Sequence, residues 1–165
     1  MAKPLVGILM GSDSDLPIMK EAGEALKSFE IPYVIRILSA HRAPKEVAAF
    51  AEQASKEGFR VIIAGAGGAA HLAGAVAAHT EIPVIGVPIA NGPMQGVDAL
   101  HATVQMPKGI PVATVAIGNA YNAGLLAVQI LASGGAQQDE ALKKKFLDFK
   151  EEMRKKVLAK KIDPQ

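Results

Sequence analysis

Short apolar runs alternate with longer amphipathic stretches along most of the chain. Each run is four to six residues long and almost continuously hydrophobic, as is typical of strands that are buried on both faces of a parallel sheet. The runs that predict strands lie at residues 5–10, 33–38, 61–64, 83–87 and 112–117.

The stretches between these runs have the spacing of helices. From residue 16 to residue 29, apolar residues recur every three or four positions, Ser14 or Asp15 can cap the helix, and Pro17 suits its first turn. The other stretches predict helices over residues 46–57, 71–78, 96–105, 120–132 and 140–161.

Strands that alternate with helices predict an α/β fold. Right-handed crossovers then favour a three-layer, doubly wound parallel sheet of the flavodoxin-like type, with strand order 2-1-3-4-5 and an added C-terminal helix. We expect one domain over residues 1–165, with its core in residues 5–133 and the last helix in residues 138–161.

Composition narrows the functional classes. Half of the residues are hydrophobic but only 4% are aromatic, so the core must be largely aliphatic. The absence of cysteine excludes disulfides and thiolate metal sites, and a net charge of +2 gives no reason to expect a nucleic-acid partner. The first apolar run is too short to span a membrane and no signal-peptide cleavage pattern follows it, so we expect a cytoplasmic protein.

Polar or glycine-rich segments follow the first three predicted strands, at residues 11–15, 39–44 and 65–71. In a doubly wound sheet, ligands bind beyond the carboxyl ends of the strands, at the switch in strand order. With the order 2-1-3-4-5, the three segments are neighbours at that edge, so the sequence predicts a ligand site there.

The segment after the second strand carries the most informative pair, His41 and Arg42. Histidine can donate and accept a proton near neutral pH, whereas arginine stays charged and offers a planar fork to a phosphate or carboxylate. The pair therefore fits a proton-transfer group beside an anion-binding group. From these residues alone, a solvated polar turn is an equally good interpretation.

The segment after the first strand carries Ser12 and Ser14, whose hydroxyls lie next to a predicted helix N-terminus where a phosphate is favoured. Asp13 and Asp15 would repel that phosphate, so at least one of them should face sugar hydroxyls or cap the helix. Taken alone, this segment favours an ordinary capping turn.

The segment after the third strand, residues 65–70, fits the dinucleotide pattern G-x-G-x-x-A, but the pattern normally follows the first strand and is paired with a later acid. A bend that lets a ligand approach the backbone is the better interpretation, with His71 beginning the next helix. His79 suits a helix C-terminus and His101 a structural position, and no ligand spacing predicts a metal site.

Four ordered motifs together resemble the PurE family of purine biosynthesis, class I, whose members are N5-carboxyaminoimidazole ribonucleotide mutases. The resemblance covers about residues 5–131 and implies a flavodoxin-like subunit, a homo-octamer, a nucleotide substrate, and a reaction without metal or other cofactor. The motifs are GSDSD at 11–15, SAHRAP at 39–44, AGAGGAAHL at 64–72 and QMPKGIPVAT at 105–114.

The resemblance also implies roles for individual residues. His41 would be the catalytic acid and base, and Asp15 would bind the ribose. Ser12, Ser39 and Arg42 would bind the phosphate of the nucleotide. Ser14 is added to this group because its hydroxyl lies next to the predicted helix N-terminus. The base and the migrating carboxylate would be walled by Ala66, Gly67, Gly68, His71 and Leu72.

Arg42 and the Gly-Gly-Ala-Ala-His run favour the mutase over class II relatives, which carboxylate aminoimidazole ribonucleotide directly with CO2 and usually carry lysine where this chain has Arg42. The chain departs from the class I pattern at Ala73, where proline is common, in residues 89–95, and in a short loop at 118–122. A Rossmann-type nucleotide enzyme and a non-catalytic flavodoxin-like binding module remain alternatives.

The predicted helix at residues 123–132 is apolar on nearly every side, which an exposed helix of a monomer would not tolerate. We therefore expect an obligate oligomer. The last helix adds an apolar stripe suited to packing on its own or a neighbouring subunit, formed by Leu142, Phe146, Phe149, Met153 and Val157.

Overall fold

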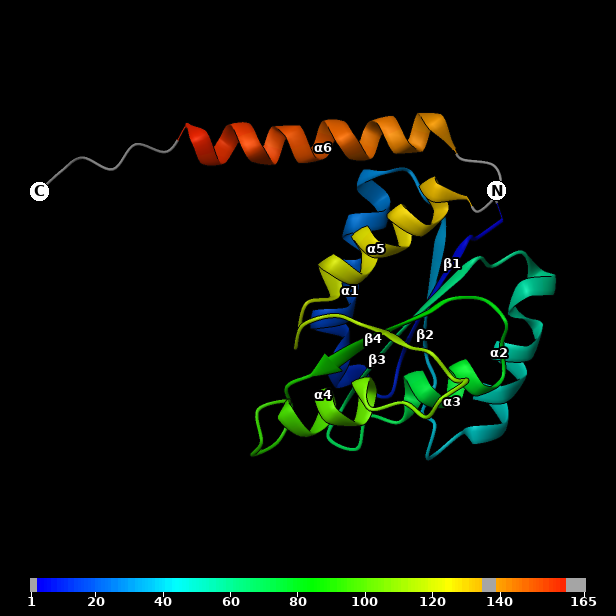
Figure 1. Ribbon diagram of the computed structural model, residues 1–165. Helices are drawn as coiled ribbons and strands as arrows, with labels where there is room; N and C mark the ends of the chain where they lie inside the picture. Colours follow the sequence, from blue (N-terminus) through cyan, green and yellow to red (C-terminus); the bar gives the residue numbers. More distant parts are fainter. Residues whose placement is uncertain (1–2, 135–138, 160–165) are drawn as a thin grey trace, which may run out of the picture.

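The computed structural model describes residues 3–134 and 139–159, in which five parallel strands form one sheet with the order β2-β1-β3-β4-β5 (Figure 1). This order confirms the predicted doubly wound topology, and the switch in direction lies between β1 and β3. The strands are β1 (Val6–Met10), β2 (Tyr33–Ile37), β3 (Val61–Gly67), β4 (Val84–Ile89) and β5 (Ala113–Thr114).

Helices cover both faces of the sheet because consecutive strand residues point to opposite sides. In β1, Ile8 and Met10 belong to the core cluster under α1 (Leu16–Ser28) and α5 (Ala120–Ser133), whereas Leu9 belongs to the cluster under the helices of the other face. Those helices are α2 (Pro44–Glu57), α3 (Leu72–Ala78) and α4 (Val97–Val104).

Three strands differ from the prediction by two residues or more. The fourth strand ends at Ile89 and not at residue 87. The third strand continues through Gly67 because Gly65 and Ala66 pair with β4, and a side chain on Gly65 would overlap Met19 of α1. The fifth strand was predicted over residues 112–117 but comprises only Ala113–Thr114. It lies at the sheet edge, where single bonds from Val115 to Gly86 and from Gly118 to Pro88 replace a regular ladder.

One side of helix α5 is buried within the chain, whereas its larger apolar side chains are partly buried. Gly124 lets it approach α1 closely, since a Cβ there would lie only 2.7 Å from the backbone oxygen of Ala22. The last helix, α6 (Glu140–Leu158), covers α5 from outside, and its Phe146 packs against Phe29. The apolar circumference of residues 123–132 is thus covered in part by α1 and α6 of the same chain.

The apolar stripe of α6 divides between two environments. Leu142, Phe146 and Phe149 pack on the subunit's own core. Met153 and Val157 are 43% and 64% exposed, on the half of the helix that extends past the body of the domain (Figure 1). The predicted ends at residues 138 and 161 lie outside the described residues. None of the described helices is both long and apolar enough to cross a membrane.

Candidate active site

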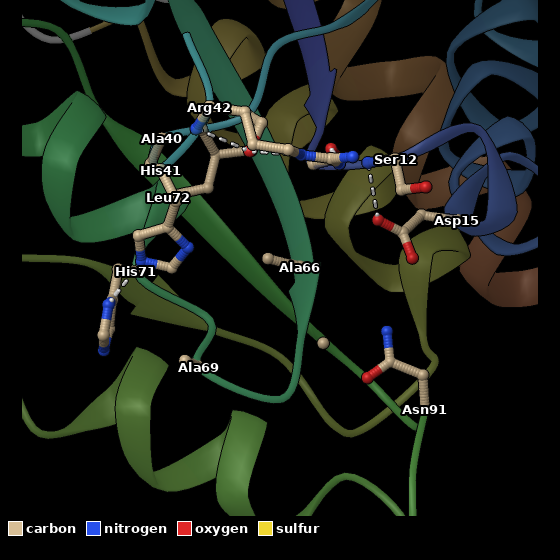
Figure 2. Close-up of a pocket in the computed structure, with 13 residues that line it drawn as sticks. Ser12, Asp15, Ala40, His41, Arg42, Ala66, Ala69, His71, Leu72 and Asn91 are labelled. Carbon is tan, nitrogen blue, oxygen red and sulfur yellow. Dashed lines mark hydrogen bonds between the residues drawn. The ribbon is translucent and has the colours of Figure 1, made fainter. Parts of the chain in front are cut away.

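The segments that follow β1, β2, β3 and β4 line one pocket of about 310 Å³ at the carboxyl edge of the sheet. The predicted neighbourhood of the first three segments is therefore present in the structure. Figure 2 shows their side chains around a common space. The lining residues are Gly11, Ser12, Asp15, Ser39, Ala40, His41, Arg42, Ala66, Gly67, Ala69, His71, Leu72 and Asn91.

The turn after β1 is a capping box. Ser12 is the N-cap of the short 3-10 helix Asp13–Asp15, and its backbone N–H donates to Asp15 Oδ2 over 3.1 Å. The Ser12 hydroxyl donates to Asp13 over 2.9 Å, and the Ser14 N–H donates to the same Asp13 oxygen over 3.0 Å. The interpretation as a capping turn is thus confirmed, while Ser12 and Asp15 also face the pocket.

The two carboxylates of this turn differ in electrostatic environment. Asp15 is only 3% exposed, and this burial raises its pKa above the ordinary value, although hydrogen bonds from the turn oppose the change. Asp13 is exposed, and the hydrogen bond from Ser12 lowers its pKa. The pocket therefore has one buried carboxyl group that ionises less readily than an exposed one.

Arg42 connects the segment after β2 to the segment after β1 by a hydrogen bond. Its Nη2 donates to the Gly11 carbonyl over 2.7 Å, and its Nε donates to the Ser39 hydroxyl over 3.3 Å. A guanidinium carries five N–H donors, so these two contacts leave others for an anion. Arg42 and Ser39 thus lie beside Ser12 at one wall of the pocket.

His41 and His71 form a pair at another wall of the pocket. His41 Nε2 lies 2.8 Å from His71 Nδ1, and the rings meet edge to face with centroids 5.0 Å apart. One nitrogen must carry the hydrogen and the other must accept it, so the pair shares a single proton across this contact. The second ring nitrogen of each histidine is left for another partner.

Most predicted site residues line this pocket, but Ser14 and Gly68 do not. Ser14 points its N–H back into the capping turn, and Gly68 occupies the bend after β3 with φ of +57°. Sequence reasoning missed Asn91, the second residue after β4. Its signal was available, because it is a polar residue that follows a strand at the same edge.

The other histidines lie outside the pocket. His79 ends α3 and meets Glu52 of α2 over 3.1 Å, in keeping with its predicted place at a helix C-terminus. His101 is exposed on α4. In residues 3–134 and 139–159, no three His, Cys, Asp or Glu side chains are grouped as a metal site would require.

Comparison with known proteins identifies the family. Residues 5–156 match the AIR carboxylase family, and the chain belongs to it. An N5-carboxyaminoimidazole ribonucleotide mutase from Pyrococcus horikoshii is 54% identical over 155 residues, which are 94% of this chain and 88% of that protein. The crystal structure of Treponema denticola PurE matches with a TM-score of 0.82 and 30% identity, over 94% of both chains.

Longer relatives carry a different name. A phosphoribosylaminoimidazole carboxylase from Saccharomyces cerevisiae is 54% identical over 153 residues, which are 93% of this chain but 27% of the yeast protein. This chain therefore spans about a quarter of that relative's length.

The raised pKa of Asp15 predicts a pH-dependent contribution to stability. Because folding favours the protonated carboxyl group, this contribution is complete below its ordinary pKa and is lost as the pH rises through the higher folded value. Asp15→Asn should reduce that loss, because the amide can still accept the Ser12 N–H without becoming charged. The free energy of unfolding in urea, measured at several values between pH 3 and pH 7, checks this.

The matched control is Asp148→Asn, which changes an exposed carboxylate on α6. A stability profile for Asp15→Asn that is parallel to that of the wild type would contradict the assignment of this pH dependence to Asp15.

Proposed function

We propose that this protein is an N5-carboxyaminoimidazole ribonucleotide mutase of purine biosynthesis. The observation that carries the proposal is the 54% identity to proteins of that name over nearly their whole length, in a chain that keeps the four motifs. The paired His41 and His71, in a pocket whose other wall holds Arg42, support it with suitable chemistry.

The reaction moves a carboxylate from the exocyclic nitrogen of an aminoimidazole to ring carbon C4. Protonation of the nitrogen breaks the N–CO2 bond and leaves CO2 beside an electron-rich ring. C4 then attacks that CO2, and the proton on C4 departs. One proton is added and one is removed, so the oxidation state is unchanged and one acid–base group can serve both steps.

His41 is the residue that we assign to this proton transfer. Its Nε2 faces His71, which fixes the ring and leaves Nδ1 for the substrate. The ring gives a proton to the exocyclic nitrogen and recovers one from C4, so it ends in its starting form. The pocket must meanwhile exclude water long enough for C4 to recapture the CO2.

Each wall of the pocket is assigned to one part of the substrate. Arg42, Ser39 and Ser12 hold the phosphate. Ser14, which the sequence also suggested for this site, does not line the pocket. Asp15 accepts from ribose hydroxyls. The aminoimidazole lies against the end of β3 and the start of α3, where the assigned contacts are Ala66, Gly67, Gly68, His71 and Leu72.

Direct carboxylation of aminoimidazole ribonucleotide by CO2 is the second candidate, because the yeast relatives are named carboxylases at similar identity. An assay of the purified protein with each substrate separates the two. A mutase converts N5-carboxyaminoimidazole ribonucleotide without added bicarbonate, whereas a carboxylase needs aminoimidazole ribonucleotide and CO2. Conversion of neither substrate would favour a flavodoxin-like binding module.

We expect His41→Asn to lower turnover by at least about 100-fold, since asparagine keeps a polar side chain but cannot exchange a proton. Steady-state kinetics with N5-carboxyaminoimidazole ribonucleotide check this. The control is His79→Asn, which alters an exposed histidine outside the pocket. Activity of His41→Asn within a few-fold of wild type would contradict the assignment of His41 as the proton-transfer residue.

Arg42→Lys should raise KM by roughly 10-fold or more with a smaller change in kcat. A lysine keeps the charge but cannot reproduce the parallel hydrogen bonds of a guanidinium to phosphate. The expected effect falls on KM because phosphate is held equally in the ground and transition states.

Arg60→Lys makes the same exchange outside this pocket and serves as the control. Unchanged kinetics for Arg42→Lys would mean that Arg42 does not touch the substrate. A loss confined to kcat would move Arg42 to the migrating carboxylate.

We also propose that the protein is a cytoplasmic homo-oligomer, and an octamer by family resemblance. The exposed apolar residues of α6, which include Met153, Val157 and Leu158, support a subunit contact on that helix. Light scattering should give the mass of an octamer at micromolar concentration, and Val157→Asp should lower that mass. A monomer for the unmodified protein would refute the oligomer.

A further inference from the structure

Asn91 forms the wall of the pocket that β4 contributes. Its side chain fills the space that a side chain on Gly67 would occupy, and its Oδ1 lies 3.8 Å from the place of a Cβ on Gly68. Gly67 therefore makes room for the Asn91 amide, whereas a Cβ on Gly68 would be in ordinary van der Waals contact with it. Figure 2 shows Asn91 across the pocket from the pair of His41 and His71.

The backbone around Asn91 is tightly constrained. The Asn91 N–H donates to the Ile89 carbonyl over 3.1 Å, and the Gln95 N–H donates to the Gly92 carbonyl over 3.3 Å. Gly92 and Gln95 both have positive φ, at +84° and +50°. This turn fixes the position from which the Asn91 side chain projects.

The Asn91 amide, in contrast, has no protein hydrogen bond within residues 3–134 and 139–159, and the residue is exposed to the pocket. An amide offers two donors and an acceptor oxygen, and all of them are available to a ligand. A polar group on a fixed backbone with unused donors is suited to orienting a bound molecule.

The proposed reaction can use one more donor beside His71, which is assigned to the wall around the base and the migrating carboxylate. The substrate has two anionic groups, a phosphate and a carboxylate, and the guanidinium of Arg42 with its two serines accounts only for the phosphate. His41 is occupied with proton transfer, and the carboxylate of Asp15 would repel another carboxylate. Among the side chains that line the pocket, Asn91 is the remaining donor that has no assigned role.

We propose that Asn91 is a substrate-orienting residue whose side-chain N–H groups bind the migrating carboxylate. The proposal rests on the proposed mutase function. A neutral amide suits this task, because it can hold the carboxylate on nitrogen and on carbon without trapping either as a strong ion pair. Its place opposite His41 keeps the CO2 and the proton donor on different sides of the ring.

Two nucleotides test the proposal, because they differ only in the carboxylate: 4-carboxy-5-aminoimidazole ribonucleotide and aminoimidazole ribonucleotide. Calorimetric titration of Asn91→Ala should show affinity for the carboxylated nucleotide lower by roughly 10-fold or more, in line with a lost hydrogen bond to a charged group. Affinity for the other nucleotide should stay within about 2-fold, which a merely structural role of Asn91 does not predict.

A second variant and a control complete the design. Asn91→Asp keeps the shape but adds a negative charge, so its loss for the carboxylated nucleotide should exceed that of Asn91→Ala. It also serves if Asn91→Ala does not fold. Met94→Ala changes an exposed residue of the same turn that does not line the pocket, and both affinities should stay as in the wild type.

The outcomes separate the two proposals. If the wild type does not convert N5-carboxyaminoimidazole ribonucleotide, the mutase function itself fails. If the wild type is an active mutase but the Asn91 variants lose equal affinity for both nucleotides, or lose none, the role of Asn91 is overturned.

Discussion

The pocket depends on the parallel alignment of β2, β1, β3 and β4. The ladder pairs Met10 with both Ile37 and Gly65, and it pairs Gly67 with Ile89, so the four strands end at one edge. Chemistry-bearing residues that are about 80 positions apart in sequence, from Gly11 to Asn91, therefore meet. An antiparallel or shifted strand would separate them whatever their identity.

Glycines at the end of β3 leave space for side chains from neighbouring elements at this edge of the sheet. Gly65 leaves space for the side chain of Met19 on α1, and Gly67 leaves space for the amide of Asn91. The Arg42–Gly11 hydrogen bond then joins the loops after β2 and β1. The pocket thus combines a wall with Ser12, Ser39 and Arg42, a buried carboxyl group on Asp15 and a pair of histidines. These groups come from the segments after β1, β2 and β3.

Much of the fold could be predicted from the sequence because the hydrophobic pattern repeats cleanly. The strand order and the convergence of the segments at 11–15, 39–44 and 65–71 are confirmed. The short length of β5 was not predicted, because its apolar residues suggested a strand of six residues. At the edge of the sheet β5 pairs with β4 alone, and only two of its residues join the ladder. The packing of α6 on α5 was left open, because periodicity does not reveal which surface an apolar stripe covers.

The site was predicted less completely than the fold, because it depends on contacts between distant residues. Sequence motifs identify which segments carry chemistry, but not which side chains turn inward. Ser14 turned out to bond within its own capping turn, and Asn91 came from a segment that the motifs did not include. The contact between His41 and His71 joins residues 30 positions apart and depends on the bend at Gly68, which no local pattern indicates.

The central claim is that the carboxylate moves from nitrogen to carbon within one pocket. Retention of that carboxylate in the product tests this claim most directly. The measurement follows N5-carboxyaminoimidazole ribonucleotide labelled with carbon-13 in its carboxylate, converted in the presence of excess unlabelled bicarbonate. If the pocket holds the CO2 between its release from nitrogen and its capture by C4, the product keeps nearly all of the label. A product whose label is diluted to that of the solution would contradict the account, because the carboxylate would then have come from free CO2.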